Sequence, residues 1–205
     1  CLAQFQRVIL VHPENIMSTP THTPSPQHAA FSAIQGDHWI EALDDGTPVL
    51  IRPLRPEDRE REQAFIRRLS TRSQRNRFLG EVHEASPALL DQLMSIDHHR
   101  TMAFVALAHD DGELREVGIS RYGAGEQGDR CECAVVVADD WRHRGLAVIL
   151  MRHLIDVARK EGFHTLYSVD LAENDGMRDL ASYLGFTRAP DPDDATLVIH
   201  SLTLS

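Results

Sequence analysis

The sequence predicts an α/β (α+β) fold, in which a mixed, twisted sheet of six to seven strands carries helices on both faces. Two observations lead to this fold class. Short apolar runs with strand character alternate along the chain with segments whose apolar residues recur at three- and four-residue steps. Gly162 and Gly185 follow the two clearest of these segments, where a helix commonly ends. With 42% hydrophobic and 25% charged residues among 205, the composition is that of one ordinary globular domain.

The first 40 residues are predicted to be a disordered tail, and residues 41–205 the folded domain. Pro, Ser, Thr, His and Gln dominate residues 18–36 without apolar periodicity. Met17, followed by Ser, Thr and Pro, is a candidate for the natural start of the chain. Order is expected to begin near Trp39.

One strand and two helices are expected next. Residues 49–52 form the strand, Pro56 opens the first helix, and Ser86 and Pro87 begin the second. A basic run lies between the helices and has two interpretations. It either contacts a phosphate or an acceptor, or it is a solvated helix end balanced by nearby acids, and we favour the second. The run consists of Arg67, Arg68, Arg72, Arg75 and Arg77.

A hairpin follows, with strands at residues 102–108 and 117–122 joined by a tight turn at residues 110–112. Residues 123–128 then read G-x-G-x-x-G. A dinucleotide site needs a helix directly after this pattern, whereas here another strand follows. We therefore interpret these residues as a hairpin loop.

Residues 131–147 connect a strand to a helix and are the most informative part of the chain. An apolar run through Val137 is followed by a short polar bend, and helical periodicity begins after Gly145. The start of a helix presents unpaired N–H groups and a positive dipole, which together bind phosphate. Arg142 and Arg144 add charged donors, and Gly145 and Ala147 leave room for close approach. The stretch predicts a cradle for a phosphorylated ligand. A strand at 165–171, a helix at 174–184 and a strand at 196–204 complete the chain.

Arg142-x-x-Gly145-x-Ala147 resembles the pyrophosphate-binding motif of the GNAT acyltransferases. Residues 172–177, with Leu180 and residues 184–186, are similar to the family's second signature. The resemblance runs from about Gly46 to the C-terminus. It implies a GNAT-like fold and acetyl-CoA as the co-substrate. The implied cofactor-binding residues are Val135, Val136, Val137, Arg142, His143, Arg144, Gly145, Leu146, Ala147, Asn174 and Met177. Asn174 is also a candidate helix N-cap.

Glu132 is the predicted general base. It is a charged residue within an apolar strand, and burial there would raise its pKa toward the range useful for taking a proton from an amine. The competing interpretation is a structural, partnered glutamate. Residues 132–137 are similar to the Glu-x-Ala-x-x-Val strand of bacterial protein lysine acetyltransferases, in which the Glu is the base. The resemblance therefore implies a protein lysine as acceptor. A backbone N–H near Val136 or Val137 would stabilise the oxyanion.

One position departs from the family pattern. Many GNAT enzymes carry a tyrosine that protonates the departing thiolate, and Ala181 occupies that position here. Tyr183 lies about 200° further round the helix and does not replace it. Coenzyme A thiol, with a pKa of about 8.5, can leave without a dedicated acid. Two alternatives remain: transfer to a small amine or amino acid, and a catalytically silent acyl-CoA-binding module.

Composition bears on partners and compartment. A formal net charge of -10 disfavours nucleic acid, and no apolar run is long enough to span a membrane. Cys131 and Cys133 alternate along one strand and are expected to be reduced core residues, which favours a cytoplasmic setting. His98 and His99 either line an acceptor groove or face solvent. None of the twelve histidines shows metal-ligand spacing, so no metal is expected.

Overall fold

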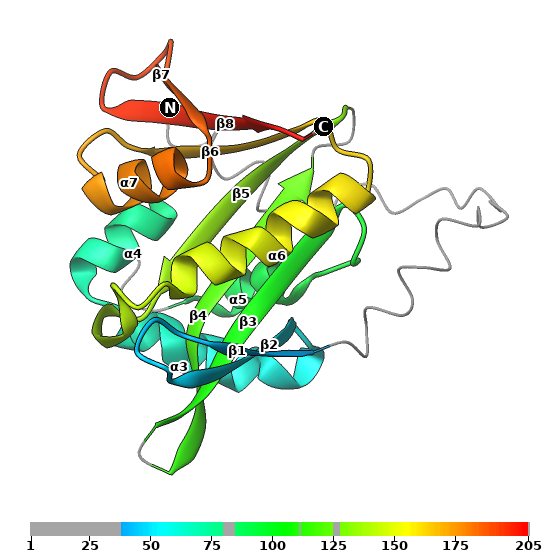
Figure 1. The fold of residues 1–205 in the computed structure, drawn as a ribbon, viewed down its shortest axis with the longest axis vertical. Helices are drawn as coiled ribbons and strands as arrows, with labels where there is room; N and C mark the ends of the chain where they lie inside the picture. The colour runs from blue at the N-terminus through cyan, green and yellow to red at the C-terminus, as the bar shows by residue number, and fades with distance from the viewer. Residues whose placement is uncertain (1–37, 80–84, 111, 125–127, 205) are drawn as a thin grey trace, which may run out of the picture.

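The chain folds around one eight-stranded sheet with the strand order β1-β2-β3-β4-β5-β6-β8-β7 (Figure 1). The computed structural model describes residues 38–79, 85–110, 112–124 and 128–204. The strands are β1 Trp39–Ala42, β2 Pro48–Pro53, β3 Thr101–Asp110, β4 Glu113–Ala124, β5 Arg130–Val137, β6 Thr165–Leu171, β7 Thr187–Pro190 and β8 Leu197–Thr203. The helices are α3 Arg59–Arg68, α4 Thr71–Phe78, α5 Pro87–Met94, α6 Leu146–Lys160 and α7 Asp175–Tyr183, with 3-10 turns at Pro56–Asp58 and Asp139–Trp141.

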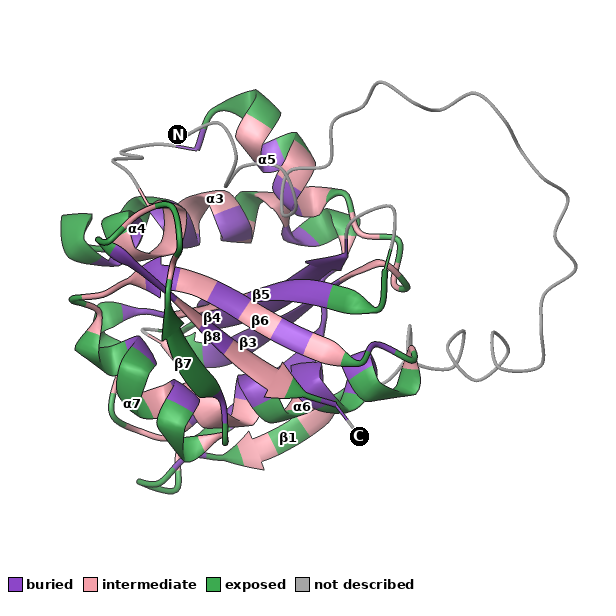
Figure 2. Cartoon of the chain, turned by 90° about the horizontal axis from the view of Figure 1, so that it is seen from above, coloured by how far each residue is buried: buried purple, intermediate pink, exposed green. Residues whose placement is uncertain are grey.

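Helices cover both faces of the sheet, which confirms the predicted fold class. In the view of Figure 2, α3, α4 and α5 lie on one side of the sheet and α6 and α7 on the other. The α6 helix is the best-buried of these elements, because Leu150, Met151 and Leu154 are 0% exposed against the sheet. Its apolar residues at three- and four-residue spacing explain why it forms a helix and which face it buries. No helix in the described ranges is long and apolar enough to cross a bilayer.

The sheet has eight strands, slightly more than the six to seven predicted, because the two short edge strands were not expected. Strands β1 and β7 have four residues each, too few for an alternating pattern to show in the sequence. Trp39 and Ile40, assigned to the tail by the prediction, already belong to β1. The rest of the predicted tail, residues 1–37, lies outside the described residues.

The α4 helix was also missed as an element, because its sequence is polar up to Phe78 and shows no apolar periodicity. Tertiary contacts hold it: the Ser70 hydroxyl accepts the N–H of Ser73 at 3.3 Å as an N-cap, and both serine hydroxyls donate to Asp139. In the hairpin loops, Gly112 has a φ of +81°, as a tight turn requires. Asp111 and residues 125–127 lie outside the described residues. Because β5 follows that second loop directly, no helix begins there, and the dinucleotide interpretation is excluded.

The feature that creates the site is the separation of β5 from β6. These neighbours are the sheet's parallel pair, and they are registered only at Arg130–Thr165, Cys131–Leu166 and Glu132–Tyr167. Beyond this point β5 continues to Val137 and β6 to Leu171 without further pairing between them. The facing backbone groups of the two strands are therefore free to bind a ligand.

Candidate functional site

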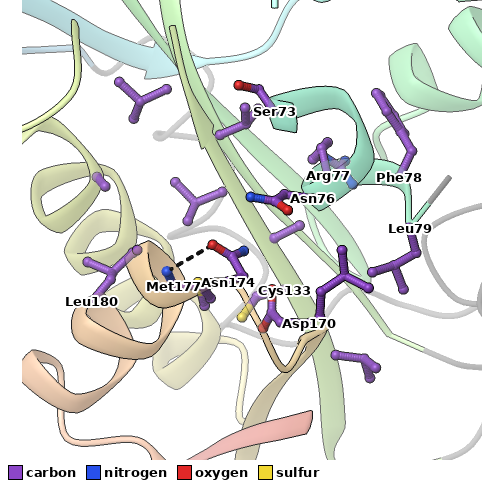
Figure 3. A pocket seen from close by; sticks show the side chains of 18 of the residues that line it. Ser73, Asn76, Arg77, Phe78, Leu79, Cys133, Asp170, Asn174, Met177 and Leu180 are labelled. Atoms are coloured by element: carbon purple, nitrogen blue, oxygen red, sulfur yellow. Dashed lines mark hydrogen bonds between the residues drawn. The ribbon is translucent and has the colours of Figure 1, made fainter. Parts of the chain in front are cut away.

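A cavity of about 1270 Å³ occupies the opening between β5 and β6 (Figure 3). Residues 132–137 of β5 form one wall, and Tyr167, Val169 and Asp170 of β6 form the other. The α4 helix closes the cavity from one face of the sheet, and the starts of α6 and α7 border it from the other. Parallel pairing ends at the inner end of this opening, so an extended ligand can lie between the strands in place of the missing backbone partners.

The predicted phosphate cradle lies at the outer end of this cavity. Gly145 has a φ of +81°, and a Cβ there would come within 2.9 Å of the Asp44 carboxylate. The N–H of Asp44 donates to the Arg144 carbonyl at 3.1 Å, which holds this close approach in place. The α6 helix begins at the next residue, Leu146, and Leu146 and Ala147 both line the cavity. The positive φ therefore favours glycine where the first free N–H groups of α6 meet the cavity, and an added Cβ would also oblige the exposed Asp44 carboxylate to move.

Arg142 is tied into a polar network beside the cradle. Its guanidinium donates to the Ser73 hydroxyl at 2.6 Å and lies 3.1 Å from Asp139. Asp139 also accepts the N–H of Ser70 at 2.8 Å, so the bend is fastened to the start of α4. Arg142 and His143 line the cavity, and His143 has a φ of +59°.

Arg144 does not line the cavity with Arg142 and His143. Its guanidinium lies over the Trp141 ring, 4.9 Å from the ring centroid, and donates to the Asp140 carbonyl at 3.1 Å. It also pairs with Asp45 at 3.4 Å. Arg144 is not among the residues that line the cavity, so its prediction as a ligand contact is not supported and its observed role is to brace the bend.

Glu132 lies at the inner end of the cavity and is only 9% exposed. Burial raises the pKa of its carboxyl group to about 7. The nearby guanidinium of Arg77 lowers this pKa and the carboxylate of Asp170 raises it, so burial dominates. A carboxyl group of this pKa is half ionised near neutral pH, where it can take a proton from an amine.

Cys131 and Cys133 are poorly suited to act as nucleophiles. Both are free and buried, and burial raises the pKa of Cys131 to about 12 and that of Cys133 well above its usual value. Their thiols stay protonated at neutral pH. A covalent acyl-cysteine intermediate is therefore not favoured here.

Asn174 is the helix N-cap expected from the sequence, and it also lies in the cavity. Its side-chain oxygen accepts the N–H of Met177 at 3.3 Å and caps α7, and both residues line the cavity. Ala181, at the position where many GNAT enzymes carry the acid tyrosine, is a core residue that is 1% exposed and has no group that could donate a proton. Tyr183 is 67% exposed and lies outside this cavity, with its hydroxyl 3.5 Å from Arg152. It does not supply the missing acid.

Some arginines of the basic run at residues 67–77 line the cavity, and others pair with groups elsewhere on the protein. Arg72 and Arg77 line the cavity. In contrast, Arg75 pairs with Glu173 at 3.2 Å, and Arg68 donates to the Glu116 carbonyl at 2.8 Å. His98 and His99 do not line the cavity, and His99 pairs with Glu161. Within the described part of the chain, no group of three or more potential metal ligands comes together.

Tyr167 and Asp170 are the polar residues that β6 contributes to the cavity, and neither was predicted. Asp170 is an acid in a strand that also contains Thr165 and Ser168, so it does not stand out from an apolar run as Glu132 does. Its partner His200, on β8, was not predictable, because the contact depends on the pairing of β6 with β8. The cavity walls supplied by α4 and α5, including Phe78, Leu89 and Leu93, have no sequence signal of their own.

Comparison with known proteins gives a consistent result. The profile of the Acetyltransferase (GNAT) family matches residues 65–186. A curated acetyltransferase of Pseudomonas aeruginosa is 64% identical over 176 residues, which cover 86% of this chain and 95% of the relative. The solved GNAT domain of PAT from S. lividans superposes with a TM-score of 0.73 at 22% identity, over 89% of this chain and 100% of that domain. A cAMP-binding acyltransferase from Mycobacterium smegmatis gives 0.57 at 21% identity, and this chain spans 54% of it. At 21–22% identity, the likeness to these two solved structures shows the fold and nothing more.

Proposed function

The chain belongs to the GNAT acetyltransferase family, and from this premise we propose that it transfers an acetyl group directly from acetyl-CoA to a primary amine, with Glu132 as the general base. The family makes it an N-acetyltransferase that uses acetyl-CoA as co-substrate. The observation that carries the proposal is the position of Glu132: a buried carboxyl group with a pKa raised to about 7 shares one cavity with a helix-start phosphate cradle.

The diphosphate of coenzyme A is assigned to the bend formed by residues 142–147. The free N–H groups at the start of α6, the guanidinium of Arg142 and the absence of a side chain at Gly145 support this assignment. The pantetheine arm then follows the unpaired edge of β5 at Val135 to Val137, with Asn174 and Met177 on the opposite side. This path leads the thioester toward Glu132.

The chemistry follows from these positions. A lysine amine has an unperturbed pKa of about 10.4 and reaches the site protonated, so a base must take a proton before it can attack. Glu132 takes that proton, and the nitrogen adds to the thioester carbon. Negative charge develops on the thioester oxygen, where an N–H of Val136 or Val137 can stabilise it.

A protein lysine is the proposed acceptor. The similarity of residues 132–137 to the strand of bacterial protein lysine acetyltransferases supports it. Asp179, Asp193 and Asp194 at the border of the cavity, together with a net charge of -10, favour a cationic partner. The free thiols of Cys131 and Cys133 support a reducing, cytoplasmic setting.

One observation favours a second acceptor class, the free amino acids. Arg77 lines the cavity near Glu132, and its guanidinium lies over the Phe78 ring, 5.1 Å from the ring centroid, without a hydrogen bond or ion pair to any described residue. A guanidinium in that position can bind the carboxylate of a small zwitterionic substrate. The two acceptor classes separate in one comparison: R77Q would abolish transfer to free amino acids, while transfer to lysine in a peptide would persist.

The test of the main proposal is Glu132→Gln, which keeps the shape of the side chain and removes the base. The variant should lose turnover by roughly a hundredfold or more while its affinity for coenzyme A stays within about threefold. Turnover is followed as release of free thiol, and binding by calorimetry. Full turnover in E132Q would overturn the assignment of the base. Failure of the wild type to bind coenzyme A would overturn the proposal altogether.

A further inference from the structure

Asp170 stands in the cavity with only one of its carboxylate oxygens engaged. The Ser168 hydroxyl donates to Oδ2 at 2.7 Å, and Nδ1 of His200 lies 3.1 Å from the same atom. His200 is 2% exposed, and its Nε2 has no partner among the residues that the structure describes. Because both contacts fall on Oδ2, the carboxylate is fixed in orientation and Oδ1 is the oxygen left to face the cavity.

The groups around Asp170 come from four elements. On β5 they are Cys133 and Glu132, on β8 His200, on α4 Arg77, and on its own strand Ser168. The side chains of Cys133 and Asp170 overlap in the view of Figure 3, and the carboxylate of Asp170 is near enough to help raise the pKa of the Cys133 thiol. The carboxylate therefore stands at the inner end of the opening. By the register of the two strands, Glu132 lies on the face of Tyr167 and Asp170 on the opposite face, so the two carboxylates border the opening from opposite sides of the sheet.

The proposed function places the reacting thioester at the same point, and the inference rests on it. The acceptor nitrogen must lie within hydrogen-bond reach of Glu132 when it attacks. The thioester carbon, and the sulfur bonded to it, are then between β5 and β6 at the level of Cys133 and Asp170. A carboxylate there can touch both the nitrogen and the sulfur of the tetrahedral intermediate, which are bonded to one carbon.

We propose that Asp170, held by Ser168 and His200, is a second catalytic carboxylate that carries a proton from the acceptor nitrogen to the departing sulfur of coenzyme A. It fills the role left open by Ala181.

The step balances without any further reactant. Glu132 takes the first proton from the ammonium group, and attack leaves a nitrogen that is again positively charged. Asp170 Oδ1 accepts the second proton as the N–H bond breaks. The C–S bond then breaks with its electron pair going to sulfur, and the O–H proton of Asp170 moves to that sulfur. The products are the acetylated amine and coenzyme A thiol, and Asp170 returns to the carboxylate.

Tyr167 is the competing proton donor, since it also lines the cavity. Burial, together with the nearby carboxylate of Glu132, raises the pKa of its phenol to about 12. A phenol that holds its proton so firmly can donate to a thiolate but cannot first accept a proton from the nitrogen. The carboxylate can do both, which favours Asp170.

The decisive measurement is the ionisation of coenzyme A thiol bound to the protein, followed by the ultraviolet absorbance of the thiolate. The protein's own Cys131 and Cys133 stay protonated over the range used, and protein without coenzyme A is the blank. A carboxylate beside the sulfur disfavours the thiolate, so the wild-type midpoint should lie above that of free coenzyme A. In D170N the midpoint should fall by roughly one pH unit, and kcat should fall at least tenfold with little change in the KM for acetyl-CoA.

Three controls sharpen the result. Asp156→Asn removes a carboxylate from the exposed face of α6, outside this cavity, and should change neither quantity. S168A loosens the hold on Oδ2 and should lower kcat less than D170N does. Y167F should leave the thiol midpoint in place. A wild-type midpoint equal to that of free coenzyme A would overturn the proposal without needing a variant, and so would a midpoint that moves in Y167F but not in D170N. In both cases coenzyme A still binds, whereas failure to bind at all would be the failure of the proposed function.

Discussion

Glu132 on β5 and Tyr167 on β6 form the last registered pair before the two strands separate. This pairing anchors the backbone on both sides of the proposed base, so the carboxylate stands on a rigid part of the sheet at the closed end of the cavity. The next residues of both strands are free of each other and can bind a ligand. The end of the β5–β6 pairing therefore both positions the proposed base and opens the space for the acyl donor.

The pH dependence of turnover should report the ionisation of Glu132. Its pKa is raised to about 7, so the basic form is lost as the pH falls through neutrality. Below this point kcat/KM should fall about tenfold per pH unit, and above it the rate should level off. Arg77 lowers the pKa of Glu132, so in R77Q the acidic fall of kcat/KM should occur at higher pH. If kcat/KM fell only near pH 4.5, the carboxyl group of Glu132 would not be buried as described.

The same raised pKa affects stability. A carboxyl group whose pKa rises from 4.5 to about 7 on folding binds protons more tightly in the folded state, so the folded state loses stability as the pH rises through that range. E132Q removes this cost. It should be more stable than the wild type at pH 8, by at most about 3 kcal/mol, and about equal to it at pH 4.

Thermal unfolding of both proteins at the two pH values is the check. A constant difference between them at the two pH values would contradict a coupling to ionisation.

How much of this site was predictable depends on whether the signal was local. The strand-to-helix bend at residues 142–147 and the acid within an apolar strand at Glu132 are local patterns, and the structure brings both to one cavity. The structure does not bring Arg144 to the cavity, because spacing along a bend does not fix the direction of a side chain, and Trp141 and Asp45 hold this one elsewhere. The α4 helix was missed because its stability comes from Asp139, distant in sequence.

The two arginines of the bend should behave differently. R142A should raise the KM for acetyl-CoA about tenfold or more, because Arg142 lines the cavity and also fastens the bend to Ser73. R144A should change this KM less than threefold and lower the melting temperature, because Arg144 braces the loop through Asp45 and the Trp141 ring. Initial rates over a range of acetyl-CoA concentrations decide the matter. Equal effects of the two substitutions would mean that Arg144 turns toward the ligand.

Direct transfer predicts that neither cysteine thiol takes part. C131A and C133A should each retain a kcat within about threefold of the wild type, since both thiols are held protonated by burial. Each substitution leaves a small gap in the core and should lower stability by about 1 kcal/mol. Mass spectrometry of the enzyme quenched with acetyl-CoA and no acceptor should find no acetylated cysteine. An acetyl group on Cys133 would replace the direct mechanism with a two-step one.

Gly145 offers the sharpest test of the cradle, because a matched glycine exists elsewhere in the chain. Alanine at position 145 would have a φ of +81°, and its Cβ would come within 2.9 Å of the Asp44 carboxylate, which is exposed and would have to shift. Gly162, at the end of α6, has a φ of +83° with nothing within 4 Å of the added Cβ. Both substitutions should cost about 1–2 kcal/mol of stability through backbone strain. Only G145A should also displace the start of α6, and with it weaken acetyl-CoA binding by about tenfold or more. Calorimetric titration with coenzyme A, at a temperature where both variants are folded, separates the two effects. If the two variants bound coenzyme A with equal affinity, the assignment of the diphosphate to the bend at residues 142–147 would be wrong.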